Sequence, residues 1–123
     1  MAFRKIGVVG AGTMGNGIAQ AFAQAGFDVV MSDVAQAALD RAMATIAGSY
    51  DRLIKKEKMT AEQKAAALGR IKTATELAAL KDADLIIEAA TENLELKLKI
   101  FKQLDDLAKA EAVIASNTSS ISI

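Results

Sequence analysis

Three glycines near the N-terminus constrain this chain more than any other feature. Their hexapeptide follows a short apolar run at residues 4–9 and precedes an apolar pattern of helical spacing at residues 13–25. It consists of Gly10, Ala11, Gly12, Thr13, Met14 and Gly15. Between a strand and a helix, a G-x-G-x-x-G sequence permits a tight turn, close approach of a pyrophosphate to the backbone, and close helix–strand packing. We therefore predict that these six residues hold the diphosphate of a dinucleotide at the positive end of the helix.

An acidic residue stands where a dinucleotide site needs one. Asp33 follows a second apolar run at residues 28–32 and lies 18 residues after Gly15. A carboxylate there accepts hydrogen bonds from the adenosine ribose and repels a 2′-phosphate, and Val34 and Ala35 carry no neutralising cation. We therefore expect NAD rather than NADP. Three alternatives stay open: FAD, which uses the same fingerprint, a tight turn without a ligand, and a helix-capping role for Asp33.

Short apolar runs alternate with helical patterns along the whole chain, which predicts an α/β fold with a doubly wound, mainly parallel sheet. Further strands are expected at residues 71–73, 85–87 and 112–115, and a last helix at residues 94–109. Between the second and third strands we expect a helix over about residues 35–57. A second helix should begin at Thr60, which has capping-box spacing to Gln63, and stop at Gly69. The prediction is a Rossmann-type domain with a long helix-pair excursion.

The helical spacing also predicts which side chains face the core. On the first helix these are Met14, Ile18, Ala21, Phe22 and Ala25. On the last helix they are Leu94, Leu98, Phe101, Leu104 and Ala108.

Composition excludes several classes of function. The 123 residues include no Cys and no His, so thiolate chemistry, the commonest general base and the commonest metal ligand are missing, and we expect no metal site. Fifteen basic residues balance fifteen acidic ones and aromatic residues make up 4%, which argues against a nucleic-acid partner. No apolar run approaches the roughly 20 residues that span a bilayer. We expect a cytoplasmic protein without a membrane partner.

Three segments together resemble the 3-hydroxyacyl-CoA dehydrogenase family, and most closely its short bacterial 3-hydroxybutyryl-CoA dehydrogenases. They read KIGVVGAGTMGNGIA at 5–19, IEAATENLELK at 87–97 and ASNTSSI at 115–121. The resemblance implies an oxidoreductase that moves hydride between NAD and the 3-hydroxyl carbon of an (S)-3-hydroxyacyl-CoA, with 3-hydroxybutyryl-CoA as the expected substrate.

The resemblance also implies roles for single residues. Glu92 and Lys97 match positions that contact the nicotinamide half of the cofactor, and Ser119 matches the serine that hydrogen-bonds the reacting oxygen of the substrate. Ser49 and Lys56 match positions that touch the CoA. The alternatives are solvated helix charges for Glu92, Lys97 and Lys56, and a cap or turn for Ser119.

The family's catalytic His–Glu pair and its helical second domain have no counterpart in residues 1–123. We therefore expect a truncated NAD-binding domain, without turnover on its own, from an enzyme that forms a homodimer. Residues 112–123 could let the chain self-associate. Two other functions stay open: a non-catalytic NAD-sensing module, and an NAD-dependent dehydrogenase of a free β-hydroxy acid.

Overall fold

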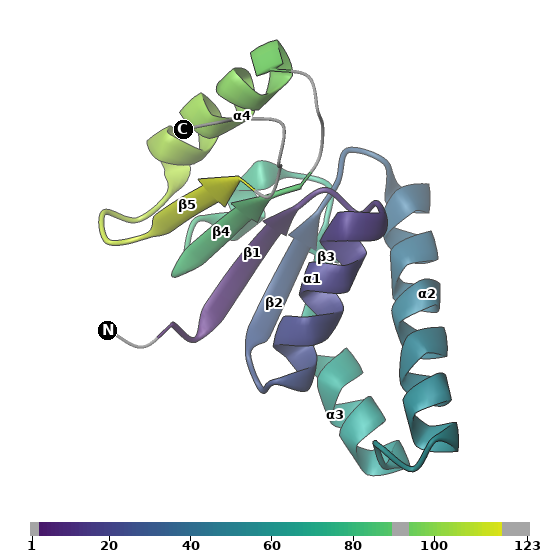
Figure 1. Ribbon diagram of the computed structural model, residues 1–123. Coiled ribbons are helices and arrows are strands. Elements are labelled where there is room, and N and C mark those ends of the chain that lie inside the picture. The colour runs from purple at the N-terminus through teal and green to yellow at the C-terminus, as the bar shows by residue number, and fades with distance from the viewer. Residues whose placement is uncertain (1–2, 90–93, 117–123) are drawn as a thin grey trace.

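A five-stranded parallel sheet forms the centre of the computed structural model, which describes residues 3–89 and 94–116 (Figure 1). The strand order is β3-β2-β1-β4-β5. The bounds are β1 (Lys5–Val9), β2 (Asp28–Ser32), β3 (Ile71–Ala74), β4 (Leu85–Glu88) and β5 (Val113–Ser116). The chain builds outward from β1 to β3 and then crosses back to β4, so the winding reverses between β1 and β4. The predicted doubly wound parallel sheet is confirmed.

Helices cover both faces of this sheet (Figure 1). They are α1 (Thr13–Gln24), α2 (Gln36–Lys55), α3 (Ala61–Arg70), the short 3₁₀ helix η1 (Leu77–Leu80) and α4 (Leu94–Leu107). The predicted helix pair between the second and third strands is present as α2 and α3. No helix in the described part of the chain combines the length and the apolar character that crossing a membrane requires.

Alternation along the strands divides the core into two clusters. Ile6 and Val8 of β1 belong to the cluster under α1, α2 and α3, whereas Val9 joins the cluster with η1 and α4. Because parallel strands are covered on both faces, they read as continuous apolar runs. This burial on both faces explains why the strands could be recognised from the sequence.

The packing faces of two helices differ from the prediction. On α1 the buried residues are Gly15, Ala19 and Ala23, whereas Met14 is 52% exposed. The predicted face was wrong at Met14, Ala21 and Ala25, which are exposed. The helix packs instead through a row of small residues spaced by four, Gly15, Ala19 and Ala23.

On α4 the predicted face was wrong at Leu98, which is 60% exposed. The charged side chain of Lys97 is buried instead, since it has an ionic partner on β4. The helix η1 was not predicted, because four residues are too few to show a helical period.

Candidate functional site

The glycine turn joins β1 to α1 through backbone that larger residues could not adopt. Gly10 has a φ of 105°, in the region that favours glycine, and its N–H donates to the carbonyl of Ser32 at 2.7 Å. A Cβ atom on Gly15 would lie 1.8 Å from the carbonyl oxygen of Gly10. Two of the three motif glycines are therefore required by the turn itself.

Gly12 is different, because none of the described residues fills the space beside it. A Cβ atom on Gly12 would meet nothing within 4 Å among the described residues, and the backbone φ of −73° suits any residue. Local packing therefore gives no reason for a glycine here. A ligand that approaches the backbone closely does give one.

The amino end of α1 lies at this turn. Gly12 is the N-cap residue, and in the described part of the chain no side chain caps this end. By contrast, α3 begins with the predicted capping box, in which Thr60 and Gln63 bond each other's backbone N–H groups. The first N–H groups of a helix lack carbonyl partners within the helix. The amino end of α1 can therefore donate to an anion.

Asp33 reaches the same turn from the end of β2. One carboxylate oxygen accepts a hydrogen bond from the N–H of Ala11 and the other from the N–H of Ala35, both at 3.0 Å. The N-cap of α2 is Ala35, so Asp33 does not cap that helix. A carboxylate has about four acceptor positions. The backbone thus orients Asp33 and leaves acceptor capacity for ligand hydroxyl groups.

Beside Asp33 lies a mainly apolar pocket of about 300 Å³. Its walls come from the ends of β1 and β2, the segment around η1, and α4. The lining residues are Val9, Gly10, Ser32, Asp33, Val34, Thr75, Leu77, Leu96, Ile100 and Gln103. Apolar walls next to an oriented carboxylate suit a flat heterocycle that carries a sugar.

A buried ion pair lies at the same edge, on the other side of the glycine turn. Glu88 ends β4 and is 0% exposed, and Lys97 in the first turn of α4 is 1% exposed. Their side chains form an ion pair. The surface-lysine alternative is therefore wrong for Lys97. Sequence reasoning missed Glu88, although a charge at the end of the apolar strand Leu85–Glu88 was the signal.

The two predicted CoA-contact residues lie away from the glycine turn. Ser49 is on α2, where its hydroxyl accepts a hydrogen bond from Arg52 at 2.9 Å. Lys56 follows the last residue of α2 and is exposed. Figure 1 shows that α2 begins near the carboxyl ends of the strands, where the glycine turn lies, and runs toward their amino ends. Lys56 therefore lies away from the glycine turn and Asp33. Glu92 and Ser119 lie outside the described residues, and their roles stay predictions.

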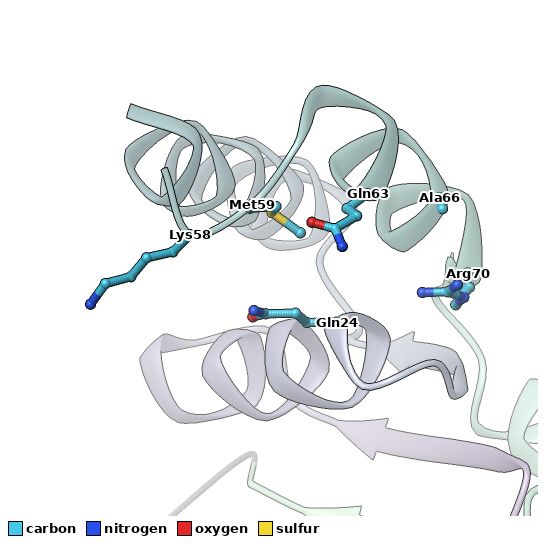
Figure 2. A pocket seen from close by; sticks show the side chains of 6 residues that line it. All are labelled: Gln24, Lys58, Met59, Gln63, Ala66 and Arg70. Atoms are coloured by element: carbon cyan, nitrogen blue, oxygen red, sulfur yellow. The ribbon is translucent and has the colours of Figure 1, made fainter. Parts of the chain in front are cut away.

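A second hollow, of about 270 Å³, lies between α1 and the helix pair (Figure 2). Two of its polar side chains, those of Arg70 and Gln63, already form hydrogen bonds within the protein. Arg70 donates to the carbonyl of Ala23 at 2.8 Å, and Gln63 completes the capping box of α3. Lys58 points away from the other lining residues in Figure 2. Among the described residues, no three His, Cys, Asp or Glu side chains gather as a metal site.

Comparison with known proteins identifies relatives over almost the whole chain. The family described as "3-hydroxyacyl-CoA dehydrogenase, NAD binding domain" matches residues 5–123. The 3-hydroxybutyryl-CoA dehydrogenase of Bradyrhizobium diazoefficiens is 52% identical over 120 residues, which cover 98% of this chain and 41% of that protein. A probable 3-hydroxybutyryl-CoA dehydrogenase of Deinococcus radiodurans is 49% identical, over 97% of this chain and 42% of that protein.

Solved structures agree with these sequence relatives. The crystal structure of (S)-3-hydroxybutyryl-CoA dehydrogenase from Ralstonia eutropha superposes with a TM-score of 0.96 at 58% identity, covering 99% of this chain and 43% of that one. The chain thus spans about two fifths of the length of these relatives. By sequence and by fold, it belongs to the 3-hydroxyacyl-CoA dehydrogenase family and corresponds to the NAD binding domain of that family.

Proposed function

We propose that this chain binds NAD and is part of an enzyme that interconverts an (S)-3-hydroxyacyl-CoA, with 3-hydroxybutyryl-CoA as substrate, and the 3-oxoacyl-CoA. The observation that carries the proposal is the space beside Gly12 at the amino end of α1, which residues 3–89 and 94–116 leave empty. A diphosphate that contacts this backbone explains a glycine that the turn does not require.

Different residues of the described chain bind different parts of the cofactor. Residues 10–15 and the first turn of α1 hold the diphosphate, while Asp33 accepts hydrogen bonds from the adenosine ribose and the pocket beside it receives the adenine ring. A 2′-phosphate would meet the negative charge of Asp33, so NAD is preferred over NADP.

When bound, NAD supplies the carbon that accepts or donates the hydride. The chain's own residues bind and orient it. Proton transfer from the substrate hydroxyl to a histidine would need a residue outside this sequence, which contains no His. We therefore propose that the 123-residue chain alone binds the cofactor without meaningful turnover. An assay with NADH and acetoacetyl-CoA that finds the full-length protein active and the chain inactive would agree.

Ser49 and Lys56 are proposed to contact the CoA. Glu92 and Lys97 are proposed to contact the nicotinamide half of the cofactor, and Ser119 to hydrogen-bond the reacting oxygen of the substrate. For the CoA, the support is chemical. Lys56 and the Arg52 guanidinium that bonds Ser49 provide cationic donors, and CoA carries several phosphate groups. Binding of NAD without any binding of CoA by the full-length protein would favour a sensor or a free-acid dehydrogenase instead.

For the whole protein we further propose a cytoplasmic homodimer with no nucleic-acid partner. The resemblance implies the dimer, and the balance of fifteen basic and fifteen acidic residues gives no large basic surface for nucleic acid. Sedimentation of the full-length protein tests the dimer, because a monomer at micromolar concentration would contradict it.

The decisive test is Gly12→Ala, measured against Gly17→Ala. Both positions have nothing within 4 Å of an added Cβ atom, so both variants should fold like the wild type. Only Gly12→Ala places a methyl group where the diphosphate must approach. We expect NAD affinity to fall about 10- to 100-fold in Gly12→Ala, since hydrogen bonds to a charged group are lost.

Gly17→Ala should bind NAD as the wild type does, and calorimetric titration of both variants provides the comparison. Equal NAD affinity in Gly12→Ala and the wild type would contradict the proposed cofactor site.

A further inference from the structure

Lys97 is expected to contact the nicotinamide half of the cofactor, but its buried partner Glu88 has no role in the contacts proposed so far. In the described part of the chain, these are the two charged side chains that are buried. Glu88 shares one face of β4 with Ile86, and both are fully buried. Lys97 comes to this face from α4, so the ion pair joins a strand end to the first turn of a helix.

The pair lies where the winding of the sheet reverses. Glu88 is in register with Val9 on β1, and the N–H of Ala89 donates to the carbonyl of Val9 at 2.8 Å. Val9 immediately precedes Gly10 of the glycine turn. In open α/β sheets, ligands bind outside the carboxyl ends of the strands at this reversal.

Stability alone does not explain a charged pair here. Removing two charges from water costs about as much free energy as their attraction returns, and well-packed apolar residues are often equally stable or more stable. A pair of this kind therefore points to something other than net stability, namely the placement of a particular group.

The position of Asp33 indicates which part of the cofactor lies near this pair. Asp33 follows β2, on one side of β1, and Glu88 ends β4, on the other side. If the adenosine ribose binds at Asp33 and the diphosphate crosses the glycine turn, the remaining half of NAD extends toward β4. That half is the nicotinamide riboside.

We propose that Glu88 is a positioning residue for the nicotinamide half of the site. It holds the ammonium group of Lys97 at the carboxyl end of β4. This inference rests on the proposed binding of NAD. It adds that one buried carboxylate, which itself need not touch the cofactor, sets the shape of one half of the cleft only.

The test compares NAD with ADP-ribose, which lacks the nicotinamide, on the wild-type chain and on Glu88→Gln. The variant keeps the side-chain shape and removes the charge that holds Lys97. We expect NAD affinity to fall about tenfold and ADP-ribose affinity to stay within about twofold of the wild type. Asp33→Ala is the matched control, because it should weaken both ligands alike.

A general structural defect would weaken both ligands, so the ratio of the two affinities is the readout. Should Glu88→Gln unfold, the double variant Glu88→Gln/Lys97→Met replaces it, since it leaves no uncompensated buried charge. The double variant should show the same roughly tenfold fall in the ratio of NAD to ADP-ribose affinity, because the two residues act as one unit.

An unchanged ratio of NAD to ADP-ribose affinity in these variants would overturn the role of Glu88 and leave the NAD site standing. Failure of the wild-type chain to bind either ligand would instead contradict the proposed function itself.

Discussion

Two carboxylates lie at the two ends of β4, and their surroundings differ. Asp84 precedes the strand and accepts hydrogen bonds from the N–H groups of Arg4 and Lys5, at 2.8 and 3.0 Å, together with an ion pair from Lys109. Glu88 ends the strand, is fully buried and forms an ion pair with Lys97. At the amino ends of the strands, the carboxylate thus joins chain segments, whereas at their carboxyl ends a buried charge lies beside the proposed cofactor site.

The two ends of α1 show the same contrast. Its first turn, at the carboxyl edge, is left without a side-chain cap. Toward its last turn, the hydroxyl of Tyr50 donates to the carbonyl of Gln20 at 2.7 Å and Arg70 donates to that of Ala23. The N–H groups that can bind a ligand therefore lie at the amino end of α1, whereas side-chain hydrogen bonds within the protein hold its carboxyl end. The contrast yields predictions that differ in size.

The largest effect is expected from Gly15→Ala at the carboxyl edge. The added Cβ atom would lie 1.8 Å from the carbonyl oxygen of Gly10, and that oxygen belongs to backbone that cannot rotate away. We expect a loss of about 3 kcal/mol in the free energy of unfolding, at the upper end of overpacking penalties. Urea denaturation followed by circular dichroism measures it.

The control is Gly17→Ala, two residues further along α1, where an added Cβ atom meets nothing within 4 Å. This change should stabilise the chain by about 0.5–1 kcal/mol, because alanine is the better helix former. Equal stabilities of the two variants would show that the turn can relax and that Gly15 is not fixed by packing.

A smaller effect, confined to stability, is expected from Asp84→Asn at the amino edge. The ion pair with Lys109 and the two backbone N–H donors hold the pKa of Asp84 well below its usual value of 3.8. A carboxylate with a lowered pKa contributes stability above its unfolded pKa and loses that contribution as the pH falls toward its folded pKa. The wild type should therefore exceed Asp84→Asn in melting temperature by several degrees at pH 7.

This difference in melting temperature should narrow as the pH falls below about 4. Affinity for NAD at neutral pH should not change, because Asp84 and the glycine turn lie at opposite ends of the strands. A melting-temperature difference that stays constant from pH 7 to pH 2 would contradict the stabilising role of the Asp84 carboxylate. A marked loss of NAD affinity in Asp84→Asn would show that the two ends of the strands do not have separate roles.

Sequence reasoning predicted the features that depend on short-range patterns. Four of the five strands follow from apolar runs, whereas β3 reads IKTA and has two exposed residues. The capping box of α3 follows from the spacing of Thr60 and Gln63. The glycine turn was readable because its constraints are local: a positive φ at Gly10 and a contact with Gly15 five residues later.

The features that sequence reasoning missed depend on contacts between distant elements. Leu98 was expected in the core, because apolar spacing does not register a charge, here Lys97, that finds its partner on another element. Glu88 is that partner, nine residues earlier in the chain. On α1, the closeness of the sheet decides that Ala19, rather than Met14, is buried.

The smallest effect concerns Tyr50, which connects α2 to α1. Burial raises the pKa of its hydroxyl above the usual 10.0, so the group remains a donor to Gln20 throughout the neutral range. Tyr50→Phe removes this bond and leaves the ring in place. It should cost about 1 kcal/mol of unfolding free energy, measured by urea denaturation, with no change in NAD affinity.

The substitution Ser49→Ala, next to Tyr50 on α2, separates an effect on stability from an effect on CoA binding. Its hydroxyl is bonded to Arg52 on the helix surface, so stability should stay within about 0.5 kcal/mol of the wild type, while the affinity of the full-length protein for CoA should fall. Suppose that Tyr50→Phe lowered the free energy of NAD binding by as much as the free energy of unfolding. That result would show that α2 positions the amino end of α1, and that the helix pair contributes to cofactor binding as well as to stability.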